Sequence, residues 1–161
     1  WDGYDADQDH PLPNIILIAG SLLILVLAFP RQKSLAAQVE AGSPVHAVDY
    51  IERHHLAGPM INDYSYGGFL IWAAPDHPVF VDGRGDVFDW TGVLSEFGRW
   101  ATLRENPNIL LDKYGVNFCV LARTSPITRV LQLLPNWKAV YSDPMSMIFV
   151  RTSQPTNALV R

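Results

Sequence analysis

Two clusters of polar side chains follow short apolar runs and combine groups that bind sugars, hydroxyls or anions. The first cluster follows residues 60–61 and the second follows residues 78–81. If both runs are parallel strands of one sheet, their carboxyl ends meet at the edge where ligands are usually held. The pattern therefore predicts a substrate-binding site, with no catalytic residue assigned, made of Asn62, Asp63, Tyr66, Asp82, Arg84 and Asp86.

A structural role for the same side chains stays open. Asp82 and Arg84 are two residues apart and could pair with each other or cap neighbouring loops. The tyrosines Tyr64 and Tyr66 could stack on a sugar or an acceptor peptide, but they could equally pack in the core or at its rim. The residue types alone do not choose between these two roles.

The sequence does not support a metal site or a nucleophile in this chain. His54 and His55 are adjacent, and adjacent side chains on a helix point apart. A calcium loop that began at Asp82 would place Arg84 at its third ligand position, where a cation is repelled. No serine or cysteine stands at a sharp strand-to-helix turn with a histidine partner. We therefore predict no metal or other cofactor within this chain.

The charge balance argues against nucleic acid as a partner. The formal net charge is −4, and the 12 lysine and arginine residues are scattered along the chain. Proteins that bind nucleic acid need a basic patch or stripe on one face.

The alternation of apolar runs and turn residues predicts an α/β fold, a small three-layer Rossmann-like sheet. Three strands, at 60–61, 78–81 and 116–122, alternate with helices, and a β-hairpin ends the domain. The arrangement is βαβαβ plus a terminal hairpin formed by residues 137–141 and 147–151. Pro144 lies in the turn between the two hairpin strands.

Residues 15–29 form an apolar run without a charge, which predicts one transmembrane helix before the domain. The chain begins at Trp1, which indicates a fragment of a longer protein with several upstream spans. The expected organisation is an inter-span loop fragment at 1–12, a transmembrane helix at 13–30, a juxtamembrane linker at 31–42, the soluble α/β domain at 43–152 and a disordered tail at 153–161.

The strings NDYSYGGFLIW (62–72) and PVFVDGRGD (78–86) resemble a known group of proteins. They look like the soluble C-terminal domain of bacterial multi-span membrane proteins that resemble GT-C glycosyltransferases, which use polyprenyl-phosphate-linked sugars. A fainter similarity links Asp63-Tyr64 to the Trp-Trp-Asp-Tyr-Gly motif of oligosaccharyltransferase catalytic subunits, which recognises the hydroxyl residue of the acceptor. Here Asn62 replaces a tryptophan of that motif.

The resemblance implies a domain that supports or selects a substrate, while the catalytic carboxylates lie between earlier spans. It implies the bacterial inner membrane as the location, with the domain on the extracytoplasmic side. The implied partners are the membrane, the rest of the multi-span chain, and a lipid-linked sugar or an acceptor. The resemblance is also compatible with a divalent metal in the transmembrane part of the longer protein. The alternative is a non-catalytic, membrane-anchored binding or assembly module.

Overall fold

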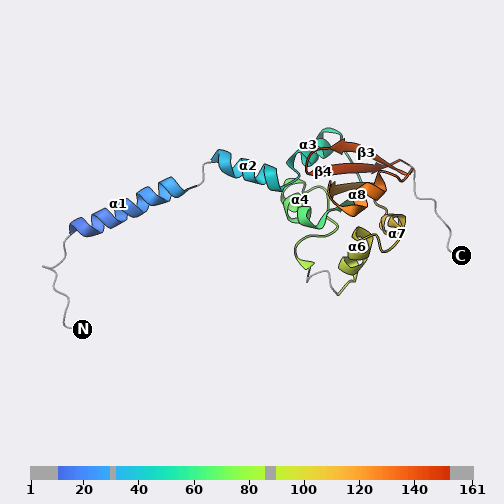
Figure 1. Ribbon diagram of the computed structural model, residues 1–161, viewed down its shortest axis with the longest axis horizontal. Coiled ribbons are helices and arrows are strands. Elements are labelled where there is room, and N and C mark those ends of the chain that lie inside the picture. The colour runs from blue at the N-terminus through green and yellow to red at the C-terminus, as the bar shows by residue number, and fades with distance from the viewer. Residues whose placement is uncertain (1–10, 30–31, 86–89, 153–161) are drawn as a thin grey trace. The chain divides into compact units, whose positions relative to one another are not determined.

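The computed structural model describes residues 11–29, 32–85 and 90–152 (Figure 1). The chain divides into two compact units, Trp1–Ala41 and Gly42–Arg161. Of the expected segments, the loop at 1–12 lies almost wholly outside the described residues, and the tail at 153–161 lies entirely outside them.

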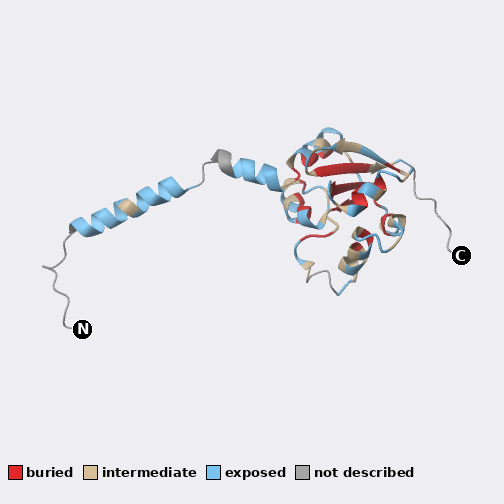
Figure 2. Ribbon diagram, in the orientation of Figure 1, coloured by how far each residue is buried: buried red, intermediate tan, exposed pale blue. Residues whose placement is uncertain are grey.

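The first unit contains the helix α1 (Pro11–Ala28) and most of α2 (Gln32–Gly42). The side chains of α1 are exposed on all sides, for example Leu17 at 68% and Leu27 at 76% (Figure 2). Among the described residues, no helix is both long and apolar enough to cross a membrane. The predicted transmembrane helix at 13–30 is therefore wrong. Pro11, Pro13 and Asn14 occupy the first turn of α1, and the apolar part that follows rises only about 21 Å, against about 30 Å of hydrocarbon.

The second unit is built on a four-stranded mixed sheet. Its strands are β1 (Met60–Asn62), β2 (Phe118–Ala122), β3 (Trp137–Ser142) and β4 (Ser146–Arg151), in the order β1-β2-β4-β3. The strands β1 and β2 are parallel, whereas β4 runs antiparallel to both β2 and β3. The strands β3 and β4 thus form an antiparallel hairpin at one edge of the sheet, as the sequence predicts.

Helices cover both faces of this sheet and give three layers (Figure 1). The helices α3 (Val45–Arg53) and α4 (Gly67–Ala73) pack on the face that carries Phe118 and Val120. The helices α6 (Val93–Ala101), α7 (Pro107–Lys113) and α8 (Pro126–Leu131) pack on the face that carries Cys119 and Leu121. The alternation of side chains along β2 therefore serves two separate cores.

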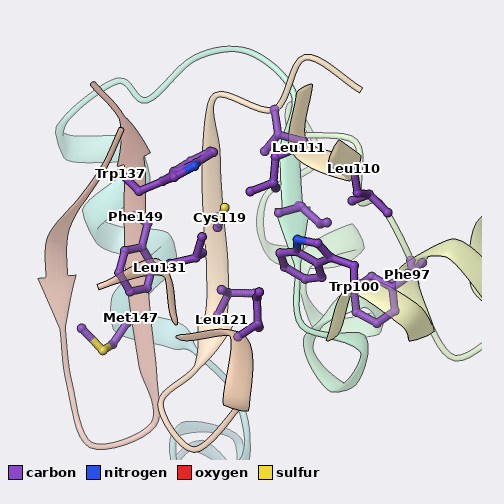
Figure 3. Close-up of a cluster of buried hydrophobic side chains, with 14 residues drawn as sticks. Phe97, Trp100, Leu110, Leu111, Cys119, Leu121, Leu131, Trp137, Met147 and Phe149 are labelled. Atoms are coloured by element: carbon purple, nitrogen blue, oxygen red, sulfur yellow. The ribbon is translucent and has the colours of Figure 1, made fainter. Parts of the chain in front are cut away.

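The larger core is formed by the second face and its three helices (Figure 3). Trp100 of α6 is fully buried there beside Phe97, and both aromatic rings lie 5.7 Å apart between their centroids. The start of α7 is fixed by Asn106, whose side chain accepts a hydrogen bond from the Asn108 N–H, and by Pro107 in the first turn. The start of α8 likewise follows Ser125 and begins with Pro126.

The expected strand at 78–81 does not form, so the Rossmann-like βαβαβ arrangement is wrong. Pro78 has no N–H to donate to a ladder, and the segment is joined to β1 by a side chain instead. The Phe80 N–H donates to Asn62 Oδ1 at 2.8 Å, and Asn62 Nδ2 donates to the Val81 carbonyl at 2.8 Å. Val81 is buried beside the sheet, and Val79 and Phe80 are half-buried, without the segment becoming a strand of it.

Gly67 allows the start of α4 to approach the end of this segment. Its backbone has an ordinary helical φ of −55°, so the position does not need the conformational freedom of glycine. A Cβ at Gly67 would instead lie 2.7 Å from Asp82 Cα and would also collide with the Val81 carbonyl oxygen. The missing side chain therefore places α4 against the loop that carries Asp82 and Arg84.

Candidate functional site

Asn62 is fully buried at the end of β1, and its amide is occupied by the protein itself. Besides its two bonds to Phe80 and Val81, Asn62 Nδ2 donates to the Asp63 carbonyl at 2.9 Å. Both amide protons and the amide oxygen thus have backbone partners. The geometry gives Asn62 the role of holding residues 80–81 beside the sheet.

Asp82 and Arg84 form a closed pair at the end of the same segment. Asp82 Oδ1 accepts from Arg84 Nε at 2.9 Å, and Asp82 Oδ2 accepts from Arg84 Nη2 at 2.6 Å. The Arg84 side chain donates these bonds and is the main reason that the pKa of Asp82 lies below its usual value, although burial opposes the shift. The Asp82 side chain is 2% exposed and the Arg84 side chain is 66% exposed, so only Arg84 of this pair presents a surface to a ligand.

Tyr66 is buried between α4 and the hairpin and also serves the fold. Its hydroxyl donates to the Met145 carbonyl, 3.0 Å away, in the turn between β3 and β4. Burial, followed by the nearby charges of Asp63 and Asp143, raises the pKa of Tyr66 to about 12. The phenol therefore stays neutral and ties the end of β1 to the hairpin.

Asp63 differs from Asn62, Asp82 and Tyr66 because one of its carboxylate oxygens can accept a further hydrogen bond. Its Oδ1 caps the short 3-10 turn η2 (Tyr64–Tyr66), accepting from the Ser65 N–H at 3.2 Å and from the Ser65 hydroxyl at 2.8 Å. Among the described residues, its Oδ2 accepts only a long bond of 3.4 Å from the Ala122 N–H. A carboxylate oxygen can accept two hydrogen bonds, so Oδ2 can take another donor.

Asp63 also lines a pocket at the carboxyl ends of the parallel strands β1 and β2. The pocket has a volume of about 140 Å³. The helix α6 supplies one wall and the start of α8 another, and part of the lining belongs to the larger core in Figure 3. The lining residues are Asp63, Tyr64, Phe97, Trp100, Ala101, Leu121, Ser125 and Ile127.

Two hydroxyls of this pocket have no partner among the described residues. Neither Tyr64 nor Ser125 makes a side-chain hydrogen bond there, and Ser125 does not cap α8 with its hydroxyl. A Cβ at Gly85 would lie 3.2 Å from the Tyr64 hydroxyl, so this phenol reaches the loop that follows Arg84. The lining residues thus carry one carboxylate oxygen with spare capacity and two hydroxyls that lack a partner among the described residues.

The sequence-predicted residues fall into different groups in the structure. Asn62, Tyr66 and Asp82 are bound to protein partners, Asp63 lines the pocket, and Arg84 is exposed on its loop. Asp86 lies outside the described residues. Ser125 was missed, although the same reasoning about strand ends could have found it, because it follows β2 and precedes Pro126 at the start of a helix.

Within the part of the chain that the structure describes, no three histidine, cysteine, aspartate or glutamate side chains are grouped so that they could hold a metal ion.

Comparison with known proteins found no family model, no curated protein and no solved structure that matches this chain.

Proposed function

We propose that this chain is the C-terminal extramembrane domain of a membrane-embedded, GT-C-like glycosyltransferase. In this proposal the domain supports or selects a substrate, and the catalytic carboxylates belong to another part of a larger protein. The observation that carries it is the pocket at the ends of β1 and β2, whose lining residues Asp63, Tyr64 and Ser125 have hydrogen-bonding capacity that no described residue uses.

These groups suit recognition of a substrate. The carboxylate of Asp63 accepts a hydrogen bond from a hydroxyl or an amine, and charge-assisted bonds of this kind are stronger than neutral ones. The hydroxyls of Ser125 and Tyr64 can each donate one bond and accept others. Arg84, fixed by Asp82, adds a guanidinium on the loop that the Tyr64 hydroxyl reaches.

The proposed cellular setting rests on the resemblance of residues 62–72 and 78–86 to domains of multi-span membrane proteins. The protein would act at the bacterial inner membrane with this domain on the extracytoplasmic side. Its partners would be the membrane, the rest of its own chain, and a lipid-linked sugar or an acceptor. A divalent metal, if the reaction needs one, would be bound in the transmembrane part.

The substitution Asp63→Asn in the full-length protein tests the proposal. Asparagine caps helices as well as aspartate does, so η2 should survive while the negative charge is lost. We expect sugar transfer to fall about tenfold or more, as for loss of one charge-assisted hydrogen bond, with an unchanged melting temperature. The matched control is Asp76→Asn, at an exposed carboxylate outside the pocket, which should transfer sugar normally.

A second candidate is a non-catalytic binding or assembly module, and the exposed face of α4 favours it. Trp72 is 78% exposed, Ile71 is 44% exposed, and the ring of Phe69 lies 6.0 Å from that of Trp72. Exposed aromatic residues of this kind are typical of protein interfaces. If Asp63→Asn leaves transfer unchanged while Trp72→Ala releases the domain from its partners, this second function is the correct one.

A further inference from the structure

We infer that the pocket at the ends of β1 and β2 receives an apolar ring of about the size of phenol, with one hydrogen-bond donor, and not a sugar ring. This inference rests on the proposed function and names the substrate class of the same site. It would make the domain a reader of the acceptor, while the sugar donor is bound elsewhere.

The volume of the pocket limits what it can hold. At about 140 Å³ it is close to an engineered apolar cavity of about 150 Å³ that binds benzene. A single six-membered ring with one small substituent therefore fits. A sugar with an acetamido group would extend beyond the pocket.

The chemistry of the lining favours an apolar ring over a sugar. The lining side chains of Phe97, Trp100, Ala101, Leu121 and Ile127 offer carbon surface, apart from the buried indole N–H of Trp100. A sugar ring carries several hydroxyls, and each one buried without a partner costs about 1–3 kcal/mol. The three available polar groups cannot satisfy them all, whereas a phenol needs only one partner.

The polar groups define where the single donor would lie. Among the described residues, Asp63 Oδ2 has only its long bond to the Ala122 N–H, and the hydroxyl of Ser125, the residue before α8, caps no helix N–H. A ligand hydroxyl would donate to Asp63 and accept from Ser125. Its ring would then contact the aromatic side chains of α6, which favour tilted or edge contacts with another ring.

Ligand-observed saturation-transfer NMR on the full chain tests this directly with three probes: 4-methylphenol, toluene and N-acetylglucosamine. We expect 4-methylphenol to bind with a millimolar Kd and toluene about tenfold more weakly, because toluene lacks the donor. N-acetylglucosamine should give no saturation transfer. Binding of toluene and 4-methylphenol with equal affinity would overturn the role of Asp63 and Ser125.

Replacing either of two alanines by leucine shows whether the probes enter this pocket. Ala101→Leu fills it and should weaken 4-methylphenol at least tenfold, whereas Ala139→Leu, at an exposed position of β3, should not change the affinity. Thermal unfolding of both variants checks that the fold is kept. If Ala101→Leu is folded and binds like the wild type, the pocket assignment is wrong.

The outcomes also separate this inference from the proposed function. If N-acetylglucosamine binds and Ala101→Leu abolishes that binding, the substrate class is wrong but selection of a substrate at this site stands. If 4-methylphenol binds as expected while Asp63→Asn leaves sugar transfer unchanged in the full-length protein, the pocket is real and the proposed function is wrong.

Discussion

At the scale of single residues, the buried carboxylate of Asp82 depends on one exposed guanidinium. Removing a charge from water is costly unless it is paired and hydrogen-bonded, and Arg84 supplies both the charge and the hydrogen bonds. This pair therefore links the pH dependence of stability to a loop at the carboxyl edge of the sheet.

We predict that Asp82 contributes to the loss of stability in acid. Its pKa is lower in the folded protein than in the unfolded chain, so the unfolded chain binds more protons near pH 4. The stabilisation is present above the unfolded pKa of about 3.9 and is lost as the pH falls through the folded value. Urea denaturation between about pH 3 and pH 6 should show a flatter profile for Asp82→Asn than for the wild type. A profile parallel to that of the wild type would contradict the prediction.

The two buried tryptophans provide a second test at this scale. Trp100 Nε1 has no acceptor among the described residues. Trp137 Nε1 instead donates to Asn108 Oδ1 at 3.3 Å, and the Arg151 guanidinium lies 4.8 Å from its ring. We expect Trp137→Phe to lower the free energy of unfolding by about 1–2 kcal/mol more than Trp100→Phe. Chemical denaturation measures both, and an equal or larger loss for Trp100→Phe would show that its N–H is satisfied in solution.

The sequence could locate polar residues at strand ends but could not show which of them already have hydrogen-bond partners within the protein. Asn62 and Asp63 are neighbours of similar chemistry, yet the amide of Asn62 is bonded to backbone groups of residues 80–81, whereas Asp63 Oδ2 has only a long bond to the Ala122 N–H among the described residues. The partners of Asn62 lie 18 and 19 residues away along the chain. Such occupancy depends on tertiary contacts that local residue patterns do not encode.

At the scale of secondary-structure elements, the position of α4 depends on close contact between its first turn and the Val81–Asp82 backbone. Gly67 makes that contact, whereas a Cβ at the next residue, Gly68, would meet no atom within 4 Å. The two adjacent glycines therefore have different roles, although the sequence suggests only a turn for both.

We predict opposite effects on stability for alanine at these two glycines. Gly67→Ala should lower the free energy of unfolding by about 2–4 kcal/mol, because backbone atoms must move to admit the Cβ. Gly68→Ala should raise it by about 0.5–1 kcal/mol, because alanine is the better helix former and the position is open. Urea denaturation of the two variants provides the comparison. A neutral Gly67→Ala would show that α4 is not packed against Asp82.

The apolar pattern predicted the strand within 116–122 correctly but not the conformation of residues 78–81. Residues 116–122 and 78–81 are both short apolar runs, and Val81 is as deeply buried as Val120. Only the first run forms a strand, β2, because both of its edges are paired with strand backbones. The second run begins with Pro78, and its backbone is hydrogen-bonded to the side chain of Asn62 instead of to a strand. Hydrophobicity alone does not reveal this difference.

At the scale of the whole molecule, both hydrophobic cores belong to residues after Gly42. All buried members of the two clusters come from the α/β unit, on one or the other face of the sheet. The helix α1 contributes to neither core and leaves large apolar side chains such as Leu17, Ile24 and Leu27 exposed. Exposed apolar surface of this extent is typical of sites that bind another apolar surface.

We therefore predict that residues 42–161 fold without the first unit. The shortened chain should keep the melting temperature of the full chain within about 2 °C, since a loss of 1 kcal/mol would shift it by at least that much. It should also stay monomeric in light scattering, whereas the full chain should associate through α1. A full chain that carries Leu17→Gln, Ile24→Gln and Leu27→Gln is the matched control, and it should associate less without a change in melting temperature.

A lower melting temperature for residues 42–161 would mean that the first unit stabilises the α/β unit. If the shortened chain still associates, the self-association surface lies on the α/β unit. Exposed Trp72 on α4 would then be the next position to substitute.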